Sequence, residues 1–470
     1  MASRRRKTIS TSSFLLRLVA FRPVPSLDGE NETVADHMIS IRDISLRFSR
    51  EPLLKPFGFK GGSLTELWQI AAGLADSEGS AANGRGVQSV LWSDAAVFSR
   101  QSEAGGNAMM LLLTDHALRL IRGRDFADPL EMLDDIFPAV LERGREITGL
   151  AGLRATFALN ALVAVDAAAW ILRARALGTE SFEEVLPEEF RPVLAGRQKR
   201  LAKVPLIAYG TSDQEIDSLA ASGCFFLKIK IGSDPHGDGN REAMLAWDKE
   251  RLSRIHERLR DHSFAETANG KVAYYLDGNG RYDSVDRVLR LLDHAEKIGA
   301  LECVHLLEEP FSEEFTEDVS AIPVRVAADE SAHTEADAVA RMEQGYGAVA
   351  LKPIAKTVSM SLRVARAARQ RGIPCFCADL TVNPLMVEWN KNFAARLEPL
   401  PGLSVGVVET NGAQNYRNWE AMVSGHPLAA EPWVRGTAAA FDLPDAFYQT
   451  SGGIFRTETT ELASIGGSHG

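Results

Sequence analysis

The sequence has few cysteines and no excess of positive charge. Four cysteines in a chain of 470 residues are too few for a fold held by a disulfide framework, so that class of protein is excluded. The chain has 52 basic and 63 acidic residues, which gives a formal net charge of −11. Nucleic-acid-binding proteins usually carry a basic surplus, and we therefore expect no nucleic-acid partner.

Long hydrophobic runs are also missing. The longest apolar stretch, Phe157 to Leu172, is interrupted by Asn160 and Asp166. It is shorter than the roughly 20 apolar residues that a membrane-spanning helix needs, so we expect no membrane partner. Hydrophobic residues make up 45% of the chain and charged residues 24%. These are the values of an ordinary folded protein, which excludes an intrinsically disordered chain.

Residues 1–37 differ from the rest of the chain. Residues 3–7 are mostly basic, and Phe14 to Phe21 is mostly apolar. This order is similar to a twin-arginine export signal, but Arg17 interrupts the apolar run and no clean cleavage site follows. We interpret residues 1–37 as a flexible basic tail and expect a cytoplasmic protein; export is the alternative.

Residues 38–203 predict an α+β domain. The stretch from Met38 to Phe48 alternates apolar and polar residues, which is the period of a half-buried strand. The segment from Lys55 to Gly62 is interpreted either as a mobile lid or as a plain turn. Two further strands are expected at Val87–Trp92 and Met109–Leu113. Two helices are expected at Pro129–Ile147 and Leu153–Leu177, and the second is apolar almost all round.

From Val204 onward, short apolar strands alternate with helical stretches, which indicates an α/β fold with a parallel sheet. The eight expected strands are Pro205–Tyr209, Phe225–Ile231, Val272–Asp277, Cys303–Glu308, Val324–Ala328, Ala348–Lys352, Pro374–Ala378 and Leu403–Val408. Their period alone does not separate a (β/α)8 barrel from an open doubly wound sheet. We assign residues 204–425 to this domain. Residues 426–470 form a C-terminal segment that we expect to return to the first domain, with a disordered end.

Ionisable residues stand at or beside the ends of successive strands, which favours a barrel because chemistry gathers at that rim. The second to sixth strands deliver, in order, Lys228 and Lys230, Asp277, Glu308, Asp329, and Lys352. Three carboxylates on one rim suit a hard divalent cation, most simply Mg²⁺. Each such residue alone is most often a surface ion-pair partner, but their order on consecutive strands argues for one site.

The lysines suggest acid–base chemistry beside this cation. Lys228 and Lys230 are two residues apart, so both point to the same face of their strand. A like charge and burial both lower the pKa of a lysine, and a neutral lysine is a competent general base. Lys230 and Lys352 would then take the α-proton of a carboxylate substrate held on Mg²⁺, through an enediolate intermediate.

This order of motifs resembles the enolase superfamily. Within it, the chain is similar to the two-lysine group of muconate lactonising enzyme, dipeptide epimerase and o-succinylbenzoate synthase. The resemblance implies a modified (β/α)8 (TIM-type) barrel with an N-terminal α+β capping domain. It implies that Asp277, Glu308 and Asp329 bind one Mg²⁺ and that Lys230 and Lys352 are the two bases. Lys228 would tune Lys230 or touch the substrate carboxylate.

Some positions depart from the family's patterns. The seventh strand has no histidine, which favours the two-lysine group over the mandelate racemase-like members. The eighth strand ends in Glu409, Thr410 and Asn411 rather than in the Asp-x-Asp of dipeptide epimerases, which puts a dipeptide substrate in doubt. Glu409 is expected either to orient a polar group of the substrate or to cap a loop, and Asn279 is a second candidate for orienting the substrate.

We therefore predict a Mg²⁺-dependent racemase or epimerase that acts on a small-molecule carboxylate, and we expect a homo-oligomer. Cycloisomerisation or β-elimination after the same first step is the alternative chemistry. A catalytically silent barrel that serves as a binding protein is a further alternative. It would be expected to lack at least one of the five principal site residues, and all five are present.

Overall fold

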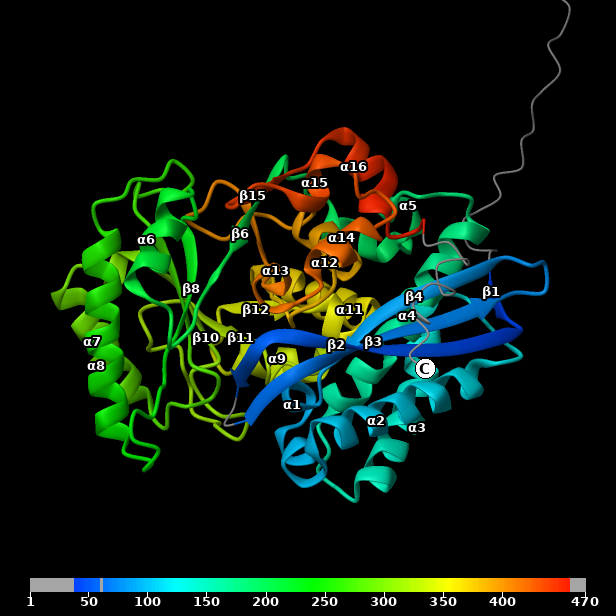
Figure 1. The fold of residues 1–470 in the computed structure, drawn as a ribbon, viewed down its shortest axis with the longest axis horizontal. Coiled ribbons are helices and arrows are strands. Elements are labelled where there is room, and N and C mark those ends of the chain that lie inside the picture. Colours follow the sequence, from blue (N-terminus) through cyan, green and yellow to red (C-terminus); the bar gives the residue numbers. More distant parts are fainter. Residues whose placement is uncertain (1–37, 60–61, 457–470) are drawn as a thin grey trace, which may run out of the picture. The chain divides into compact units, whose positions relative to one another are not determined.

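The structure is a computed structural model that describes residues 38–59 and 62–456 (Figure 1). The predicted basic tail or export signal, residues 1–37, lies outside the described residues, and so does the end of the C-terminal segment, residues 457–470.

The N-terminal half of the described chain is an α+β cap. Its strands β2 (Asp43–Phe59), β3 (Gly62–Ala75) and β4 (Ala81–Gln88) form an antiparallel sheet in the order β2-β3-β4. β1 (Ile39–Ile41) and β5 (Arg124–Phe126) form a separate antiparallel pair. The helices are α1 (Val90–Ser93), α2 (Ala95–Ile121), α3 (Pro129–Thr148) and α4 (Ala155–Ala176).

Two predicted strands of the cap are wrong. Met109–Leu113 lies inside α2, whose buried residues Met110, Leu113, Ala117 and Ile121 recur with the period of a helix rather than of a strand. The run from Val87 to Trp92 is split, because β4 ends at Gln88 and the short helix α1 begins at Val90. The chain turns there because the buried Asn107 side chain accepts a hydrogen bond from the Val90 amide at 3.0 Å.

α4 is the central helix of the fold. By length and composition it could cross a membrane, but 94% of its most apolar window is buried inside the protein, which is the pattern of a core helix. β4 lies so close to α4 that a Cβ atom at Gly84 would stand 2.0 Å from the carbonyl oxygen of Ala164. A glycine is therefore required at this crossing.

The two polar residues that interrupt α4 join the cap to the barrel. Asn160 accepts hydrogen bonds from the Ser89 amide (3.2 Å) and the Ser93 hydroxyl (3.1 Å), and so fixes α1. Asp166, fully buried, accepts hydrogen bonds from the amides of Val358 (2.8 Å) and Ser359 at the start of a barrel helix. A single helix thus positions elements of both halves.

The second half of the chain is a curled parallel sheet, which confirms the predicted barrel with an N-terminal cap. Its strands are β6 (Arg200–Val204), β7 (Leu206–Ile207), β8 (Phe226–Lys230), β9 (Ala273–Asp277), β10 (Val304–Glu308), β11 (Val326–Ala328), β12 (Ala348–Leu351), β13 (Cys375–Cys377) and β14 (Gly406–Glu409). In this sheet β6 pairs with β14, and each strand then pairs with the one before it in the sequence, from β14 to β7. Its two ends, β6 and β7, are separated only by Pro205, which has no amide hydrogen to continue the ladder. The parallel sheet therefore closes on itself.

Helices connect most of these strands. They are α6 (Asp213–Ala221), α7 (Arg241–Leu259), α8 (Val285–Lys297), α9 (Glu335–Glu343), α10 (Pro353–Lys356), α11 (Val358–Gln370) and α12 (Pro384–Ala394). In the C-terminal segment, β15 (Ala440–Asp442) pairs antiparallel with β6 of the barrel. The short helices α13 (Gly412–Asn415), α14 (Trp419–Ser424), α15 (Pro432–Arg435) and α16 (Asp445–Thr450) surround it in the chain.

Candidate active site

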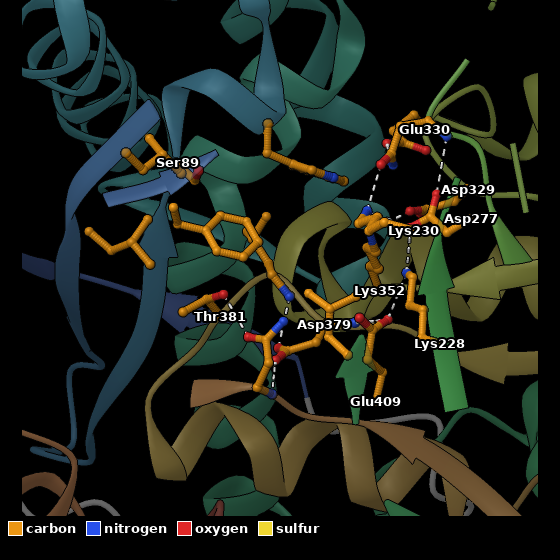
Figure 2. Close-up of a pocket in the computed structure, with 18 of the residues that line it drawn as sticks. Ser89, Lys228, Lys230, Asp277, Asp329, Glu330, Lys352, Asp379, Thr381 and Glu409 are labelled. Atoms are coloured by element: carbon orange, nitrogen blue, oxygen red, sulfur yellow. Dashed lines mark hydrogen bonds and ion pairs between the residues drawn. The ribbon is translucent and has the colours of Figure 1, made fainter. Parts of the chain in front are cut away.

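A cavity that is partly open to solvent lies at the C-terminal ends of the barrel strands (Figure 2). Its barrel side contains seven of the eight predicted site residues, namely Lys228, Lys230, Asp277, Asn279, Asp329, Lys352 and Glu409. Residues of β2, β3 and α1 close it from the cap side. The cavity is therefore shared between the two halves of the chain.

The two lysines of β8 both contact carboxylates. Lys230 donates a hydrogen bond to Asp277 Oδ2 at 2.6 Å and to Asn279 Oδ1 at 2.5 Å. Lys228 lies deeper, with its Nζ 3.0 Å from Asp277 Oδ2, 2.8 Å from Glu308 Oε2 and 3.2 Å from Glu409 Oε2. Burial disfavours its ammonium form, but Asp277, Glu308 and Glu409 outweigh burial and raise the pKa of Lys228 well above its ordinary value. Lys228 is therefore a cation here.

Lys352 enters the same cavity from β12. Its Nζ donates to Asp329 Oδ2 at 2.5 Å and lies 4.7 Å from the centre of the Trp92 ring. Burial opposes the charge, but Asp329, Glu330 and Glu308 raise the pKa of Lys352 above its ordinary value. Lys356 follows on α10, outside the strand. It does not line the cavity, and its Nζ donates to the carbonyl oxygens of Asp329 and Ala332, so it holds the turn that follows β11.

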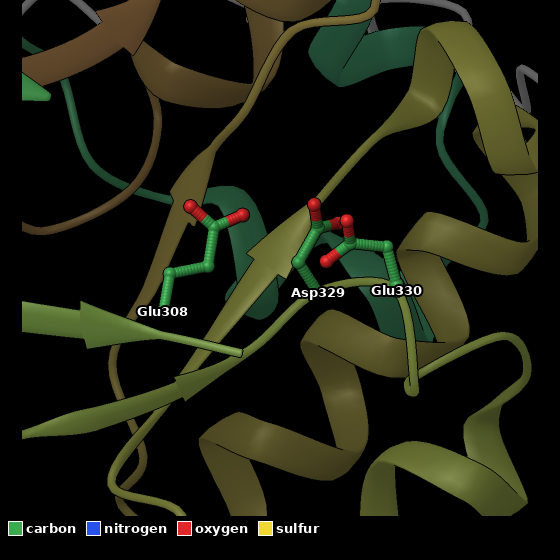
Figure 3. A group of neighbouring side chains, drawn as sticks. All are labelled: Glu308, Asp329 and Glu330. Carbon is green, nitrogen blue, oxygen red and sulfur yellow. The ribbon is translucent and has the colours of Figure 1, made fainter. Parts of the chain in front are cut away.

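Three buried carboxylates meet at the ends of β10 and β11: Glu308, Asp329 and Glu330 each have one oxygen within 4.8 Å of the others (Figure 3). This set differs from the predicted ligand set by one member, Glu330 in place of Asp277. Asp277 lies beside Glu308 in the register of β9 and β10, but its carboxylate faces Lys228 and Lys230. Glu330 accepts a hydrogen bond from Asn279 Nδ2 at 2.9 Å.

The donors present fit a divalent cation. Glu308 Oε1 and Asp329 Oδ1 are buried, and neither accepts a hydrogen bond from the part of the chain that the structure describes. Burial, the charge of Asp277 and that of Asp329 raise the pKa of Glu308 well above its ordinary value, although Lys228 acts in the opposite direction. Clustered buried carboxylates of this kind are stabilised by a hard cation such as Mg²⁺.

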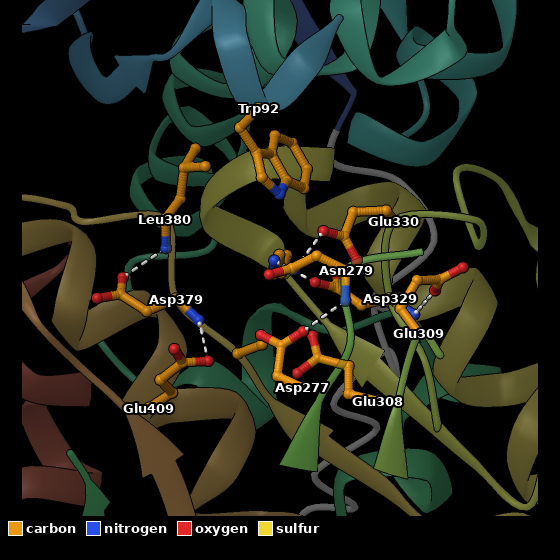
Figure 4. A network of polar contacts seen from close by, with 12 residues as sticks. Trp92, Asp277, Asn279, Glu308, Glu309, Asp329, Glu330, Asp379, Leu380 and Glu409 are labelled. Atoms are coloured by element: carbon orange, nitrogen blue, oxygen red, sulfur yellow. Dashed lines mark hydrogen bonds and ion pairs between the residues drawn. The ribbon is translucent and has the colours of Figure 1, made fainter. Parts of the chain in front are cut away.

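Asn279 and Glu309 hold the residues of the site in place (Figure 4). Asn279, the predicted substrate-orienting residue, lies between Lys230 and Glu330 and has a left-handed backbone (φ 44°). Glu309 faces away from the cavity, and its Oε2 accepts hydrogen bonds from the amides of Asp329 (2.8 Å) and Ser331 (3.3 Å). It too has a positive φ, of 38°. A backbone with positive φ at two strand ends is strained, and it persists because the surrounding contacts hold these residues in place.

Glu409 joins the eighth strand to this network. Its Oε2 contacts Lys228 and accepts a hydrogen bond from the Asp379 amide at 3.2 Å. The Asp379 side chain in turn accepts hydrogen bonds from the amides of Leu380 (2.8 Å) and Asn411 (2.7 Å). Burial and the charge of Glu409 raise the pKa of Asp379 to about 7. Asp379 was missed from the sequence, although its place at the end of the seventh strand was a signal for it.

The cap side of the cavity is mainly apolar, with Leu53, Phe57, Leu64 and Leu67 from the β2–β3 hairpin. Phe57 lies in the segment from Lys55 to Gly62, which the sequence predicted to be either a mobile lid or a plain turn. Ser89 and Trp92 complete this side from α1 and the residue before it. Neither residue was predicted from the sequence, because both become neighbours of the barrel only in the folded chain.

The fold and the cavity define a capped α/β barrel with lysines and clustered carboxylates at the strand ends. Residues 212–401 match the family model described as "Enolase C-terminal domain-like". A comparison with curated proteins found no match.

Solved structures share the fold at low sequence identity. The mandelate racemase/muconate lactonizing protein from Herpetosiphon aurantiacus has a TM-score of 0.59 and 18% identity, over 87% of this chain and 96% of that one. A dipeptide epimerase from Enterococcus faecalis, complexed with Mg and the dipeptide L-Leu-L-Tyr, has a TM-score of 0.56 and 15% identity, over 80% and 92%. An N-succinyl Arg/Lys racemase from Bacillus cereus has a TM-score of 0.56 and 15% identity, over 80% and 89%.

Proposed function

We propose that this protein is a Mg²⁺-dependent racemase or epimerase that removes and returns the proton α to a carboxylate. The observation that carries the proposal is the placement of Lys230 and Lys352. They come from the second and sixth barrel strands, enter one cavity, and each contacts a different carboxylate of the site, Asp277 and Asp329. The epimerases and racemases among the solved neighbours support the same reading.

In this proposal the lysines act as a pair on opposite faces of the substrate. One lysine takes the α-proton, and the other returns a proton to the opposite face, which inverts the configuration. Lys228, held as a cation by Asp277, Glu308 and Glu409, adds a fixed positive charge beside the substrate carboxylate. Glu409, anchored by the Asp379 amide, keeps Lys228 in position.

The proposed ligands of the metal are Asp277, Glu308 and Asp329. When bound, Mg²⁺ supplies positive charge that stabilises the enediolate oxygens. The contacts of Asp277 with Lys228 and Lys230 compete with this role, and the position of Glu330 beside Glu308 and Asp329 makes it the alternative ligand.

The test is exchange of the α-proton with D₂O in single-lysine variants. A library of chiral carboxylic acids is incubated with the Mg²⁺-loaded protein in D₂O, and proton NMR follows loss of the α-proton and interconversion of the stereoisomers. With an acid that turns over, Lys352→Ala should still exchange one stereoisomer without interconverting the two. Lys230→Ala should exchange the other.

Retained interconversion in Lys352→Ala would defeat the two-base mechanism. Loss of all exchange in only one variant would indicate β-elimination or cycloisomerisation, in which one lysine removes the proton and the other stays a cation. Lys391→Ala is the matched control, because Lys391 is a buried lysine of the barrel that pairs with Glu388 and lies outside the cavity. A barrel that serves only as a binding protein would show no exchange with any acid.

A further inference from the structure

The cap presents two polar side-chain groups to the cavity, and neither has a hydrogen-bond partner in the part of the chain that the structure describes. These are the Ser89 hydroxyl and the Trp92 indole N–H, both buried. They stand three residues apart, at the start and near the end of α1. In Figure 4 the indole nitrogen of Trp92 lies on the side of the ring that faces Asn279 and Glu330.

Other tryptophans of the cap and its interface have partners within the protein. The indole of Trp68 donates to Glu66 Oε1 and that of Trp170 to Ser359 Oγ, both at 3.0 Å. Trp433 also lacks an acceptor, but it does not line this cavity. The combination of an unpartnered donor and a place on the cavity wall therefore distinguishes Trp92.

The position of α1 is fixed on several sides. Asn107 accepts from the Val90 amide, Asn160 from the Ser89 amide, and Arg154 donates to the Trp92 carbonyl oxygen at 3.1 Å. The indole ring also lies against the Lys352 ammonium. With its backbone held at three points, α1 cannot turn Ser89 and Trp92 toward partners elsewhere without losing these contacts.

An indole N–H can only donate, and buried donors in folded proteins nearly always find an acceptor. The acceptor is therefore supplied by whatever fills the cavity, either water or a bound molecule that displaces it. The cap residues on this side of the cavity, Leu53, Phe57, Leu64 and Leu67, are apolar, and the ammonium beside the indole ring, that of Lys352, is already paired with Asp329. A second charged group of the substrate would therefore be poorly solvated beside Trp92. An uncharged carbonyl oxygen on an apolar body satisfies both conditions.

We propose that Ser89 and Trp92 form a cap subsite that binds a carbonyl oxygen of the substrate, separate from its reacting carboxylate. The substrate class is then a monocarboxylate with an apolar body and an uncharged carbonyl group. This inference rests on the proposed function for the identity of the occupant, since the reacting carboxylate is assigned to the lysine side of the cavity. Ser89 and Trp92 would bind the part of the substrate that lies on the cap side of the cavity.

The experiment uses the Mg²⁺-loaded full chain, labelled with ¹⁵N in its indoles, and two pairs of acids. Each pair replaces one C=O by CH₂: 2-benzyl-4-oxopentanoate against 2-benzylpentanoate, and 2-benzyl-5-oxohexanoate against 2-benzylhexanoate. The chain has seven tryptophans, and the indole signal of Trp92 is the one that Trp92→Phe removes. That signal should move downfield with at least one keto acid and not with its CH₂ partner.

Calorimetry with the same acids should show that the better keto acid binds about 3- to 10-fold more tightly than its CH₂ partner. The preference should disappear in Trp92→Phe and shrink in Ser89→Ala, which leaves the indole in place. Trp68→Phe is the matched control and should keep it, because the indole of Trp68 is already bonded to Glu66.

The proposal is overturned if the Trp92 signal responds equally to both members of each pair, if the preference survives in both variants, or if none of the four acids binds. The α-deuterium exchange of the same acids is read separately. A selective shift of the Trp92 signal without exchange would support the subsite and contradict the proposed reaction. Exchange of the α-proton without a selective shift of the Trp92 signal would support the proposed reaction and contradict the subsite.

Discussion

The buried carboxylates of Glu308, Asp329 and Glu330 lie close enough to repel one another unless a cation or a proton lies between them. Glu308 and Asp329 were recognised from their places at the ends of successive strands. Glu330 follows Asp329 directly, and strand alternation turns such a neighbour to the other face. It reaches the site because the chain leaves the strand after Ala328, so the alternation no longer applies.

Single amide substitutions should separate the two ligand sets. Glu308→Gln and Asp329→Asn each remove a charged oxygen donor in both sets, and we expect Mg²⁺ affinity and activity to fall at least about 100-fold. If Asp277 is the third ligand, Asp277→Asn should lower the Mg²⁺ affinity as much as these two substitutions do. If Glu330 is the third ligand, Glu330→Gln should lower the Mg²⁺ affinity more than Asp277→Asn does. Titration calorimetry with Mg²⁺ measures the affinity.

Circular dichroism of each variant is the control for folding. Full Mg²⁺-dependent activity in Asp329→Asn would show that the assignment of this ligand is wrong. An equal loss of affinity in Asp277→Asn and Glu330→Gln would indicate a site that uses all four carboxylates.

α4 was predicted as a helix that is apolar almost all round, but the roles of its polar residues were not predicted. Nothing in the local sequence links Asp166 to Val358 and Ser359, which are about 190 positions away along the chain. The barrel strands were easier to locate, because each is a short apolar run that ends in a charge. In the cap, Met110 and Leu113 lie in an apolar run that was predicted to be a strand but is part of the helix α2.

The crossing of β4 and α4 predicts a large effect of a single methyl group. Gly84→Ala places a Cβ against the backbone of Ala164 and Ala168, which cannot move without bending α4. We expect a loss of about 1–3 kcal/mol in the free energy of unfolding. Urea denaturation measures it, with Gly152→Ala as the control, since no atom lies within 4 Å of a Cβ there. Equal stability of the two variants would contradict the tight crossing.

The junction of α4 and α11 predicts a dependence of stability on pH. Burial raises the pKa of Asp166 from 3.8 to about 7, against the hydrogen bonds from Ser359 and Val358. Because the pKa of Asp166 is higher in the folded state than in the unfolded state, protonation of Asp166 stabilises the folded state. This contribution to the free energy of unfolding is complete below pH 4 and is lost as the pH rises toward 7. The stability of the wild-type protein relative to Asp166→Asn should therefore be highest near pH 4 and fall up to about pH 7.

Chemical denaturation of both proteins at pH 4.5, 5.5, 6.5 and 7.5 measures this difference. A constant difference across the range would show that Asp166 does not titrate there. Asp261→Asn, which neutralises an exposed carboxylate, is the control for effects of net charge.

For the whole molecule, a metal at the proposed site would couple cation binding to stability. A ligand that binds only the folded state stabilises it by about 2.7 kcal/mol at 100 times its dissociation constant. Addition of Mg²⁺ should therefore raise the melting temperature by a few degrees, and a chelator should reverse the rise. Differential scanning calorimetry measures it, with K⁺ at equal ionic strength as the control. The same rise in Glu308→Gln would place the stabilising cation elsewhere.

α4 also decides how the protein can be re-engineered by recombination. A chimera that exchanged caps between relatives would have to keep Gly84 matched to Ala164, and Asp166 matched to Ser359. β4, α4 and the start of α11 therefore form the smallest block that can be transplanted together. A crossover placed between the cap and the barrel, where the chain looks easiest to cut, would separate partners that each need the other.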